Sequence, residues 1–287
     1  MIRLLAHFAG SLVLIIGFST PTWAGIKLEG DAVQGGLMQG RVEPGSKVMV
    51  DKTRVRVSRE GVFLVAFGRD HGDSSVIRIT YPDGSEERQT VKVAKREYRI
   101  QRIDGLPKRK VVPKKEDLER IRRESAMIGK ARRRDDARTG FLSGWIWPVE
   151  GPISGVYGSQ RILNGKPRRP HFGVDIAVPV GTPVRSPADG IVTFTHDDMF
   201  FSGGTMIVDH GHRLSSSFLH LNKILVKQGQ HVKQGDIIAE VGKTGRVTGA
   251  HLDWRMNYHA QRIDPQLLVP PMPAQKAGSR NGPEKGG

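Results

Sequence analysis

The chain has no cysteine, and aromatic residues make up only 6% of its 287 positions. The absence of cysteine excludes disulfide bonds and thiolate metal sites, so any metal would have to be held by His, Asp or Glu. Acidic residues are also scarce, since 29 Asp and Glu stand against 45 Lys and Arg and leave a formal net charge of +16. A charge of this sign indicates an anionic polymer or surface as a partner, without saying which.

Beyond the amino-terminal segment, no apolar run in the sequence is long enough to span a bilayer. Arg3 precedes an apolar run over residues 12–18, and Thr22 and Ala24 supply small residues at the positions that a signal peptidase reads. The run is short for the roughly 20 residues needed to cross a bilayer. We therefore predict that residues 1–24 are a secretory signal peptide, cleaved near Ala24, and not a membrane anchor. The mature protein is expected to be periplasmic or secreted, without a transmembrane segment.

The first part of the mature chain, residues 25–104, is predicted to be a small β-sandwich. Short runs with period-two alternation, such as 76–81, are separated by turn sequences such as Pro82-Asp83-Gly84. This spacing is typical of sandwiches. No cluster of titratable residues lies within it, which favours a spacer or binding module.

Residues 105–140 are predicted to be a basic helical connector. Pro113 can open a helix, and acidic residues after it suit the positive amino end of the helix dipole. Leu118, Ile121 and Ile128 lie near helical spacing and leave a narrow apolar stripe. The remaining charged side is interpreted as a solvated face in preference to a site for polyanions.

Residues 141–270 are predicted to form antiparallel sheets, because short apolar strands alternate with glycine-rich turns and no long helix interrupts them. The last segment, 271–287, is poor in apolar residues and is predicted to be a disordered tail. The fold class is therefore mainly β. Export and the lack of aromatic residues among the basic ones argue against nucleic acid as a partner.

The histidines are unevenly distributed, since eight of the ten lie between His171 and His259. His171 and Asp175 lie four residues apart, which on a straight strand separates them by roughly 13 Å. A shared metal would require a bend, and Gly173 between them permits one. Farther along, strict alternation directs His251, Asp253 and Arg255 to one side of a strand and Leu252, Trp254 and Met256 to the other. Each segment taken alone is weak evidence for a site.

From about Trp145 to Val269, the sequence resembles the LytM/lysostaphin-like zinc metallopeptidases. Three stretches carry the resemblance: HFGVDIAVPVGTPVRSPADGIV, GGTMIVDHGHRLSSSFLHL and VKQGQHVKQGDIIAEVGKTGRVTGAHLDW. The resemblance implies an antiparallel β-domain with a metal-containing groove and one Zn²⁺ per chain. It does not cover the amino-terminal half.

The resemblance also implies roles for five residues. His171 and Asp175 match the first two zinc ligands of the HxxxD motif, and Asp253 stands where the second histidine of the HxH motif is normally the third ligand. His220 and His251 match active-site histidines that are catalytic and do not bind the metal. Asp253 departs from the family pattern, and a second carboxylate would make the metal a weaker Lewis acid.

Other residues near these motifs receive simpler interpretations. Tyr157 and Arg161 precede the first motif and are expected to line the groove. His210 and His212 lie in a turn-like stretch and are interpreted as structural. The remaining histidines of this half are interpreted as surface residues: His196, His231 and His259.

The implied function is an exported zinc metalloendopeptidase that hydrolyses peptide cross-links of bacterial peptidoglycan. The alternative is a catalytically inactive scaffold that activates a cell-wall amidase, and retention of four of the five expected residues favours the enzyme. The expected partners are accordingly peptidoglycan peptides and a cell-wall amidase or divisome protein. A basic polyanion-binding protein rests on charge alone. A further hypothesis is that the amino-terminal domain and the connector cover the groove in a resting state.

Overall fold

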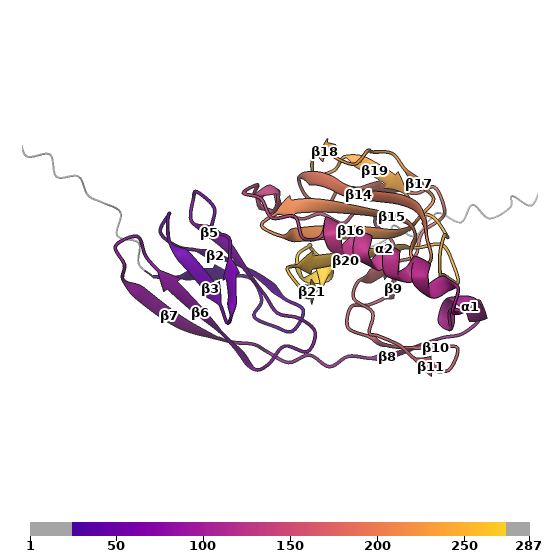
Figure 1. Cartoon of the computed structure of the whole chain (residues 1–287), viewed down its shortest axis with the longest axis horizontal. Coiled ribbons are helices and arrows are strands. Elements are labelled where there is room, and N and C mark those ends of the chain that lie inside the picture. The colour runs from indigo at the N-terminus through magenta and orange to yellow at the C-terminus, as the bar shows by residue number, and fades with distance from the viewer. Residues whose placement is uncertain (1–24, 274–287) are drawn as a thin grey trace, which may run out of the picture.

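The structure, a computed structural model, describes residues 25–273. The predicted signal peptide and all but the first three residues of the predicted tail lie outside the described residues. The described chain is mainly β, as predicted, and most strand pairs are antiparallel. Figure 1 shows a smaller β-rich unit at the amino-terminal end and a larger one that follows it.

The smaller unit consists of two antiparallel sheets, in agreement with the predicted sandwich. The alternation over 76–81 is explained by burial, because Ile77 and Ile79 are enclosed together with Phe63 and Val65 of the other sheet. One sheet has the strand order β1 (Lys27–Glu29), β2 (Leu37–Arg41), β5 (Val62–Ala66). The other has the order β4 (Thr53–Val55), β3 (Lys47–Val50), β6 (Ser74–Thr80), β7 (Glu86–Lys92).

The segment between the two units contains a strand and two helices. Strand β8 (Ile100–Ile103) leaves the sandwich and runs parallel to β10 (Gln160–Leu163) of the second unit. Helix α1 (Lys108–Val111) is one turn long, and helix α2 (Asp117–Ala131) is the predicted connector helix. Ile128 of the predicted apolar stripe packs against the second unit, whereas Leu118 is 38% exposed.

The second unit is built on one large sheet with the strand order β18-β14-β15-β16-β20-β12-β9, and β21 pairs with β20. These strands are β9 (Ile153–Gly155), β12 (Val174–Ile176), β14 (Gly190–Met199), β15 (Gly203–Gly211), β16 (Leu214–Leu221), β18 (His231–Val232), β20 (Leu252–Tyr258) and β21 (Gln261–Ile263). Smaller pairings involve β11 (Lys166–Pro167) with β10, and β13 (Pro183–Arg185) with β19 (Ile237–Glu240) and β17 (Lys223–Ile224). Two 3₁₀ turns complete the unit: η1 (Gly140–Ser143) and η2 (Pro265–Leu267).

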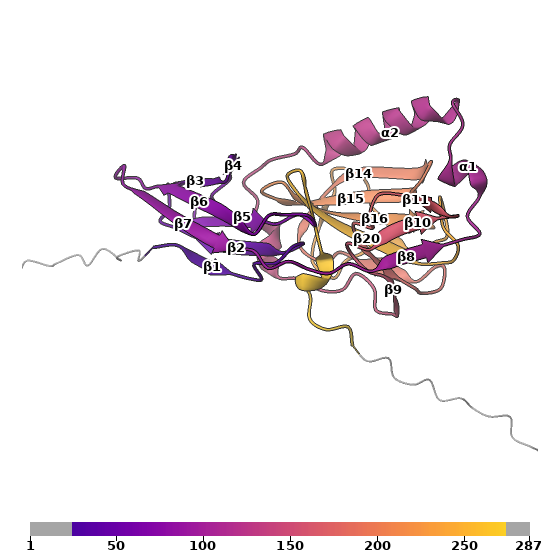
Figure 2. The same cartoon turned by 90° about the horizontal axis from the view of Figure 1, so that it is seen from below.

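Helix α2 lies along one face of the large sheet, and both cartoons show it over strands β14 to β16 (Figures 1 and 2). The register identifies this face, because Phe194, Ile207, Ser217 and Arg255 form a row of paired positions across β14, β15, β16 and β20. Residues directly opposite one another in a sheet point to the same side. Ile128 of α2 packs against Phe194 and Ile207, so α2 covers the face to which Arg255 points.

The opposite face of the sheet holds the main core of the unit. Leu252, Trp254 and Met256 of β20 are completely buried there, as the alternation of the sequence predicts. The core continues toward the amino-terminal sandwich, where the Tyr258 hydroxyl donates a buried hydrogen bond of 3.0 Å to the Leu64 carbonyl. Within residues 25–273, no helix combines the length and apolar character that a membrane span requires.

Candidate metal and catalytic site

The segment from His171 to Asp175 bends immediately before β12. Gly173 lies at the bend, and His171 Nε2 and Asp175 Oδ1 are 3.0 Å apart although four residues separate them in sequence. A Cβ atom on Gly173 would lie 2.5 Å from Arg255 Cγ and 2.6 Å from Asp253 Oδ1. Glycine is therefore required here, because the backbone passes too close to β20 for any side chain.

Strand β20 supplies the third member of the cluster. Asp253 pairs with Asp175 across the antiparallel β12–β20 ladder, and its Oδ1 lies 3.4 Å from His171 Nε2. One donor atom from each of these three residues lies within 4.8 Å of the other two. All three side chains are buried. The sheet register thus brings one imidazole and two carboxylates to a single point.

The donor atoms of this cluster fit a metal ion. Both ring nitrogens of His171 and Asp175 Oδ1 are shielded from solvent and have no hydrogen-bond partner in the protein. Buried polar atoms are normally hydrogen-bonded, so a converging set without partners is typical of ligands for a cation. A neutral imidazole and carboxylate oxygens are ligands that zinc accepts.

Each carboxylate is also paired with an arginine. Arg161 Nη2 donates to Asp175 Oδ2 at 2.5 Å, and Gly155 on β9 leaves room for that oxygen. Arg255 Nε lies 2.9 Å from Asp253 Oδ1 and 3.1 Å from Oδ2. The two guanidinium groups therefore compensate the two carboxylates before any metal binds.

These contacts set the ionisation of the cluster. Burial opposes the charge on Asp253, but Arg255 and His171 outweigh it and hold the pKa of Asp253 well below its ordinary value. Burial likewise opposes the charge on Asp175, and His171 and Arg161 lower its pKa in spite of the neighbouring Asp253. Both carboxylates are consequently ionised near neutral pH, as metal ligands must be.

His220 lies next to the cluster in an unusual backbone conformation. Its φ is +66°, a value that non-glycine residues seldom adopt. Phe218 and Leu221 both lie in the core, so this local irregularity places two successive residues, Leu219 and His220, outside it. His220 Nδ1 bonds to the Thr244 carbonyl at 2.8 Å and must be the donor, which leaves Nε2 with a free lone pair. Burial lowers the pKa of His220 to about 4, so the ring is neutral.

His251 also lies next to the cluster, immediately before β20. Its Nδ1 lies 3.0 Å from the Gly249 carbonyl, and its Nε2 lies 3.8 Å from Asp175 Oδ1. The rings of His220 and His251 have centroids 4.9 Å apart. His220 Nε2 is 4.0 Å from Asp253 Oδ2. Two imidazoles therefore flank the cluster without belonging to it.

The five residues singled out in the sequence thus come together in the fold, although their chemical roles remain a proposal. Arg161 contacts the cluster, whereas Tyr157 is buried and its hydroxyl donates to the Arg262 carbonyl. The sequence reasoning missed the pairing of Arg255 with Asp253. Its signal was present, since the two residues alternate on one side of the same strand.

The remaining histidines lie away from this site. His210 is fully buried, with Nδ1 bonded to the Asp189 carbonyl at 2.8 Å and Nε2 2.9 Å from Ser216 Oγ. His212 is buried against the ring of Phe141. His210 is thus held by two hydrogen bonds, and His212 by its packing against Phe141. His231 is exposed, whereas His196 and His259 are partly covered.

Comparison with known proteins agrees with this geometry. Residues 169–265 match the model of peptidase family M23. The peptidoglycan DD-endopeptidase ShyA of Vibrio cholerae serotype O1 is 40% identical over 103 residues, which cover 36% of this chain and 24% of ShyA. A lipoprotein NlpD/LppB homolog of Pseudomonas aeruginosa is 31% identical over 129 residues, which cover 45% of this chain and 41% of the homolog. The match therefore spans about a quarter of ShyA and less than half of the homolog.

A likeness to a solved structure extends over much more of the chain. A crystal structure from Pseudomonas aeruginosa, assigned to peptidase M23, is 30% identical with a TM-score of 0.64. The alignment covers 83% of this chain and 94% of that one, so it includes segments well before residue 169. On the family match and this extended likeness, the chain belongs to peptidase family M23.

Proposed function

We propose that this protein is a zinc-dependent endopeptidase that hydrolyses peptide cross-links of bacterial peptidoglycan. The observation that carries the proposal is the buried cluster of His171, Asp175 and Asp253, in which both ring nitrogens of His171 and Asp175 Oδ1 have no hydrogen-bond partner in the protein, while two further histidines flank it. Membership of peptidase family M23 and similarity to ShyA, a peptidoglycan DD-endopeptidase, support the substrate class. The net charge of +16 suits an anionic cell-wall polymer.

In this proposal His171, Asp175 and Asp253 hold one zinc ion per chain. Three protein ligands leave a position open, and a zinc ion held there would supply Lewis acidity toward water and the scissile carbonyl. Arg161 and Arg255 orient the two carboxylates through the hydrogen bonds described above. Hydrogen bonds to the ligand side chains are the usual way in which proteins fix the orientation of metal ligands.

The two flanking histidines carry the proton chemistry. His220 is neutral, and the Thr244 carbonyl fixes its tautomer with Nε2 directed to the site, so it accepts the proton of the attacking water and passes it to the leaving amine. His251 is more exposed, with 17% of its side chain accessible against 8% for His220. We assign His251 the hydrogen bond to the developing oxyanion, which Nε2 would donate in the imidazolium form, because Nδ1 already donates to the Gly249 carbonyl.

The test is digestion of purified peptidoglycan with zinc-loaded protein, followed through the release of new amino groups. The wild type is expected to release amines and to lose this activity with a chelator. His220→Ala is expected to reduce the rate by about 10²–10⁴-fold, the usual range for loss of a general base. His231→Ala, which changes an exposed histidine, serves as the control. Absence of amine release by the zinc-loaded wild type contradicts the proposal.

A second candidate function is the inactive scaffold that activates a cell-wall amidase. The observation that favours it is the bidentate pairing of Arg255 with Asp253, which satisfies that carboxylate without a metal. The similarity to an NlpD/LppB homolog is compatible with it. A scaffold would purify without metal and would stimulate an amidase equally well as His171→Ala. The unpartnered atoms of His171 and Asp175 favour the enzyme.

A further inference from the structure

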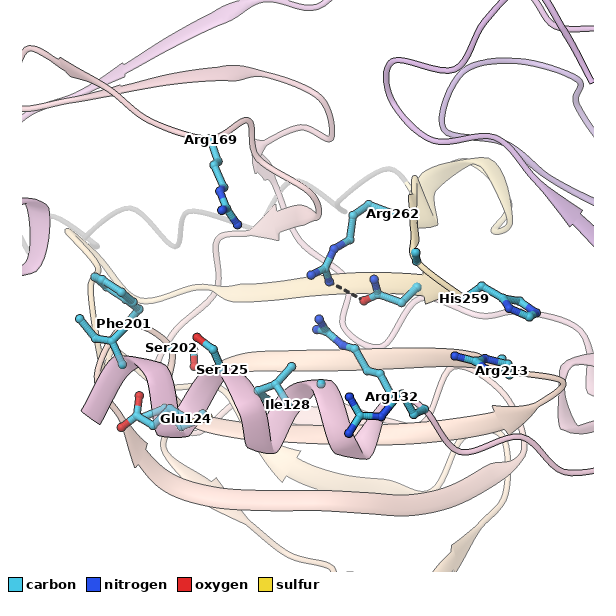
Figure 3. Close-up of a pocket in the computed structure, with 16 residues that line it drawn as sticks. Glu124, Ser125, Ile128, Arg132, Arg169, Phe201, Ser202, Arg213, His259 and Arg262 are labelled. Atoms are coloured by element: carbon cyan, nitrogen blue, oxygen red, sulfur yellow. Dashed lines mark hydrogen bonds between the residues drawn. The ribbon is translucent and has the colours of Figure 1, made fainter. Parts of the chain in front are cut away.

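A cavity of about 500 Å³ lies between α2 and the large sheet, on the face that carries Asp253 and Arg255. Figure 3 shows side chains from the helix, from the strands and from the loop before β12 around it. Among the described residues that line it, Glu124 is the only acid. Five arginines share the lining: Arg132, Arg133, Arg169, Arg213 and Arg262.

Glu124 does not balance these charges, because its carboxylate is used elsewhere. Its Oε1 accepts from Arg120 Nε at 2.6 Å, and its Oε2 accepts from the buried amide of Phe200 at 2.8 Å. The contact with Phe200 fastens α2 to the turn after β14. The cavity therefore retains an excess of positive charge.

Arg132 is the most confined of these arginines. It enters the cavity from the carboxyl end of α2, and its Nη2 donates to Ser217 Oγ at 2.9 Å. Its Nε is shielded from solvent and has no hydrogen-bond partner in the protein. Burial and the charges of Arg262 and Arg255 lower the pKa of Arg132 well below its ordinary value. Within residues 25–273, no carboxylate lies within salt-bridge distance of this guanidinium.

Arg262, which lies on β21, is also partly buried and close to other arginines. Its Nη1 donates to the amide oxygen of Asn257 at 2.8 Å, a contact drawn as a dashed line in Figure 3. Burial and the nearby Arg255 and Arg169 lower its pKa to about 10. Confining like charges in this way is costly unless an anion compensates them. The cavity is thus arranged to receive an anionic group.

The cavity and the candidate metal site lie along the same strand, because β20 contributes Asn257 to the cavity and Asp253 to the metal site. Ser217, the partner of Arg132, lies directly opposite Arg255 in the β16–β20 ladder, and Arg255 contacts Asp253. Asp253, Arg255 and Asn257 are alternate residues on one side of β20. At about 3.3 Å per residue, the distance along the strand from Asp253 to the cavity is roughly 7–13 Å. This equals two to four residues of an extended peptide.

We propose that this arginine-lined cavity binds a free carboxylate of the peptide substrate, two to four residues from the scissile bond. The inference rests on the proposed function, since it places the anion on the peptide that the metal site cuts. The planar fork of an arginine matches a carboxylate, and a peptide held at both ends would be aligned over His220 and His251. The sequence predicted a solvated face for the charged side of the connector. This prediction therefore holds only for the side of α2 that faces away from the sheet.

The test compares two synthetic peptides of identical sequence, one with a free carboxylate and one with a carboxamide at the position in question. Their dissociation constants are measured on the full chain with a chelator present, so that no hydrolysis occurs. The wild type is expected to prefer the carboxylate by about 10–100-fold, the range for a charge-assisted hydrogen bond. Arg132→Met and Arg262→Met are expected to remove most of this preference. Arg123→Met, which removes an exposed arginine from the same helix, is expected to keep it.

Two results overturn the inference: equal affinity of the wild type for both peptides, or an undiminished preference in folded Arg132→Met and Arg262→Met. Inorganic phosphate is the third ligand to be tested. If phosphate binds more tightly than the carboxylate peptide, the cavity is a site for a free anion instead.

With zinc present, cleavage of both peptides with equal KM overturns the inference while the proposed function stands. A carboxylate preference that depends on Arg132, without any hydrolysis, supports the cavity and contradicts the proposed function.

Discussion

Asp253 is the residue on which the chemistry of the candidate site depends most. It brings a negative charge to a position where the family pattern has a neutral histidine, and Arg255 neutralises that charge from the same strand. A bound cation and Arg255 would therefore both interact with the same carboxylate and would repel each other. The balance between them decides how tightly a metal is held.

Replacing Arg255 with methionine is expected to tighten zinc binding. The substitution removes a positive charge that is in direct contact with the proposed ligand Asp253, and like charges so close together repel strongly in a buried site. We expect the zinc affinity of Arg255→Met to rise by about tenfold or more, measured by competition with a chromophoric chelator. The metal-free variant should be less stable by about 3–5 kcal/mol, since Asp253 is left as an unpaired buried charge.

The control for this measurement is Arg123→Met, which makes the same change in charge at an exposed position. Its zinc affinity should equal that of the wild type. Weaker zinc binding by Arg255→Met would show that orienting the carboxylate matters more than the repulsion.

Gly173 offers a test of the bend that unites His171 with Asp175. In Gly173→Ala the added methyl group would collide with Arg255, Asp253 and the Trp254 carbonyl. We expect the free energy of unfolding to fall by about 1–3 kcal/mol, as for other overpacked sites, and zinc affinity to fall at least tenfold. Gly249→Ala is the control, because a Cβ there meets nothing within 4 Å. Equal zinc binding by both variants would contradict the role given to Gly173.

For individual residues, the sequence predicted the features that depend on strand alternation and on spacing along the chain. The need for a bend at Gly173 followed from the distance between His171 and Asp175 on a straight strand, and the shared side of Asp253 and Arg255 followed from strand geometry. The contact of Arg161 with Asp175 joins residues of different strands. The positive φ of His220 interrupts the alternation of β16. Neither could be predicted, because both depend on tertiary packing.

Among the elements, α2 is the one whose role changed most between sequence and structure. The apolar spacing predicted a helix that leans on a domain, and Ile128 does pack against β14 and β15. The sequence could not show that Glu124 and Arg132 point toward the sheet. Charged residues lie on several sides of this helix, so the sequence alone does not indicate which of them face the domain. Strand β8 is a similar case, because its parallel pairing with β10 joins segments about 60 residues apart.

Removing the anchor of α2 tests whether the helix restrains the site or helps to bind substrate. Glu124→Ala leaves the buried Phe200 amide without its acceptor and should lower the free energy of unfolding by about 1–3 kcal/mol. Amides of α2 should also exchange with solvent faster. Because Arg132 belongs to the same helix, we expect weaker binding and slower cleavage of carboxylate peptides.

Glu119→Ala is the matched control, since Glu119 is an exposed acid of the same helix. Faster cleavage by Glu124→Ala, with Glu119→Ala unchanged, would instead support the hypothesis that the connector covers the groove at rest.

In the whole molecule, the sandwich and the second unit share one core and are joined by buried polar contacts. Arg96 of the connecting segment pairs with Asp264 at 2.8 Å, and the Asp264 amide donates to the Gly35 carbonyl at 2.7 Å. The sequence predicted both β-rich parts, but residues so far apart cannot be matched from local patterns. The extended likeness to the Pseudomonas aeruginosa structure agrees with an arrangement in which both parts belong together.

Buried histidines should make the whole fold sensitive to mild acid. Burial lowers the pKa of His210 to about 4 and that of His212 to about 4, whereas an unfolded histidine has a pKa of about 6.5. Between these values the unfolded state takes up protons that the folded state does not, so stability is lost as the pH falls from about 6.5 toward 4. Asp209, whose pKa burial raises to about 6, opposes this trend in part.

Denaturant unfolding at several pH values measures this effect. His210→Gln is expected to flatten the decline by roughly 3 kcal/mol over the interval, at about 1.4 kcal/mol per pKa unit. His231→Gln changes an exposed histidine and should leave the pH profile as it is in the wild type. A decline equally steep in His210→Gln would place the acid sensitivity elsewhere.

The central claim is that His171, Asp175 and Asp253 hold a catalytic metal, and metal content tests it most directly. Protein purified with zinc supplied and then dialysed is analysed for zinc per chain in the wild type, in His171→Ala and in the exposed-site control His231→Ala. We predict one zinc per chain in the wild type and in the control, and loss of most of it in His171→Ala. A folded wild type without zinc, or zinc content unchanged in His171→Ala, would contradict the account.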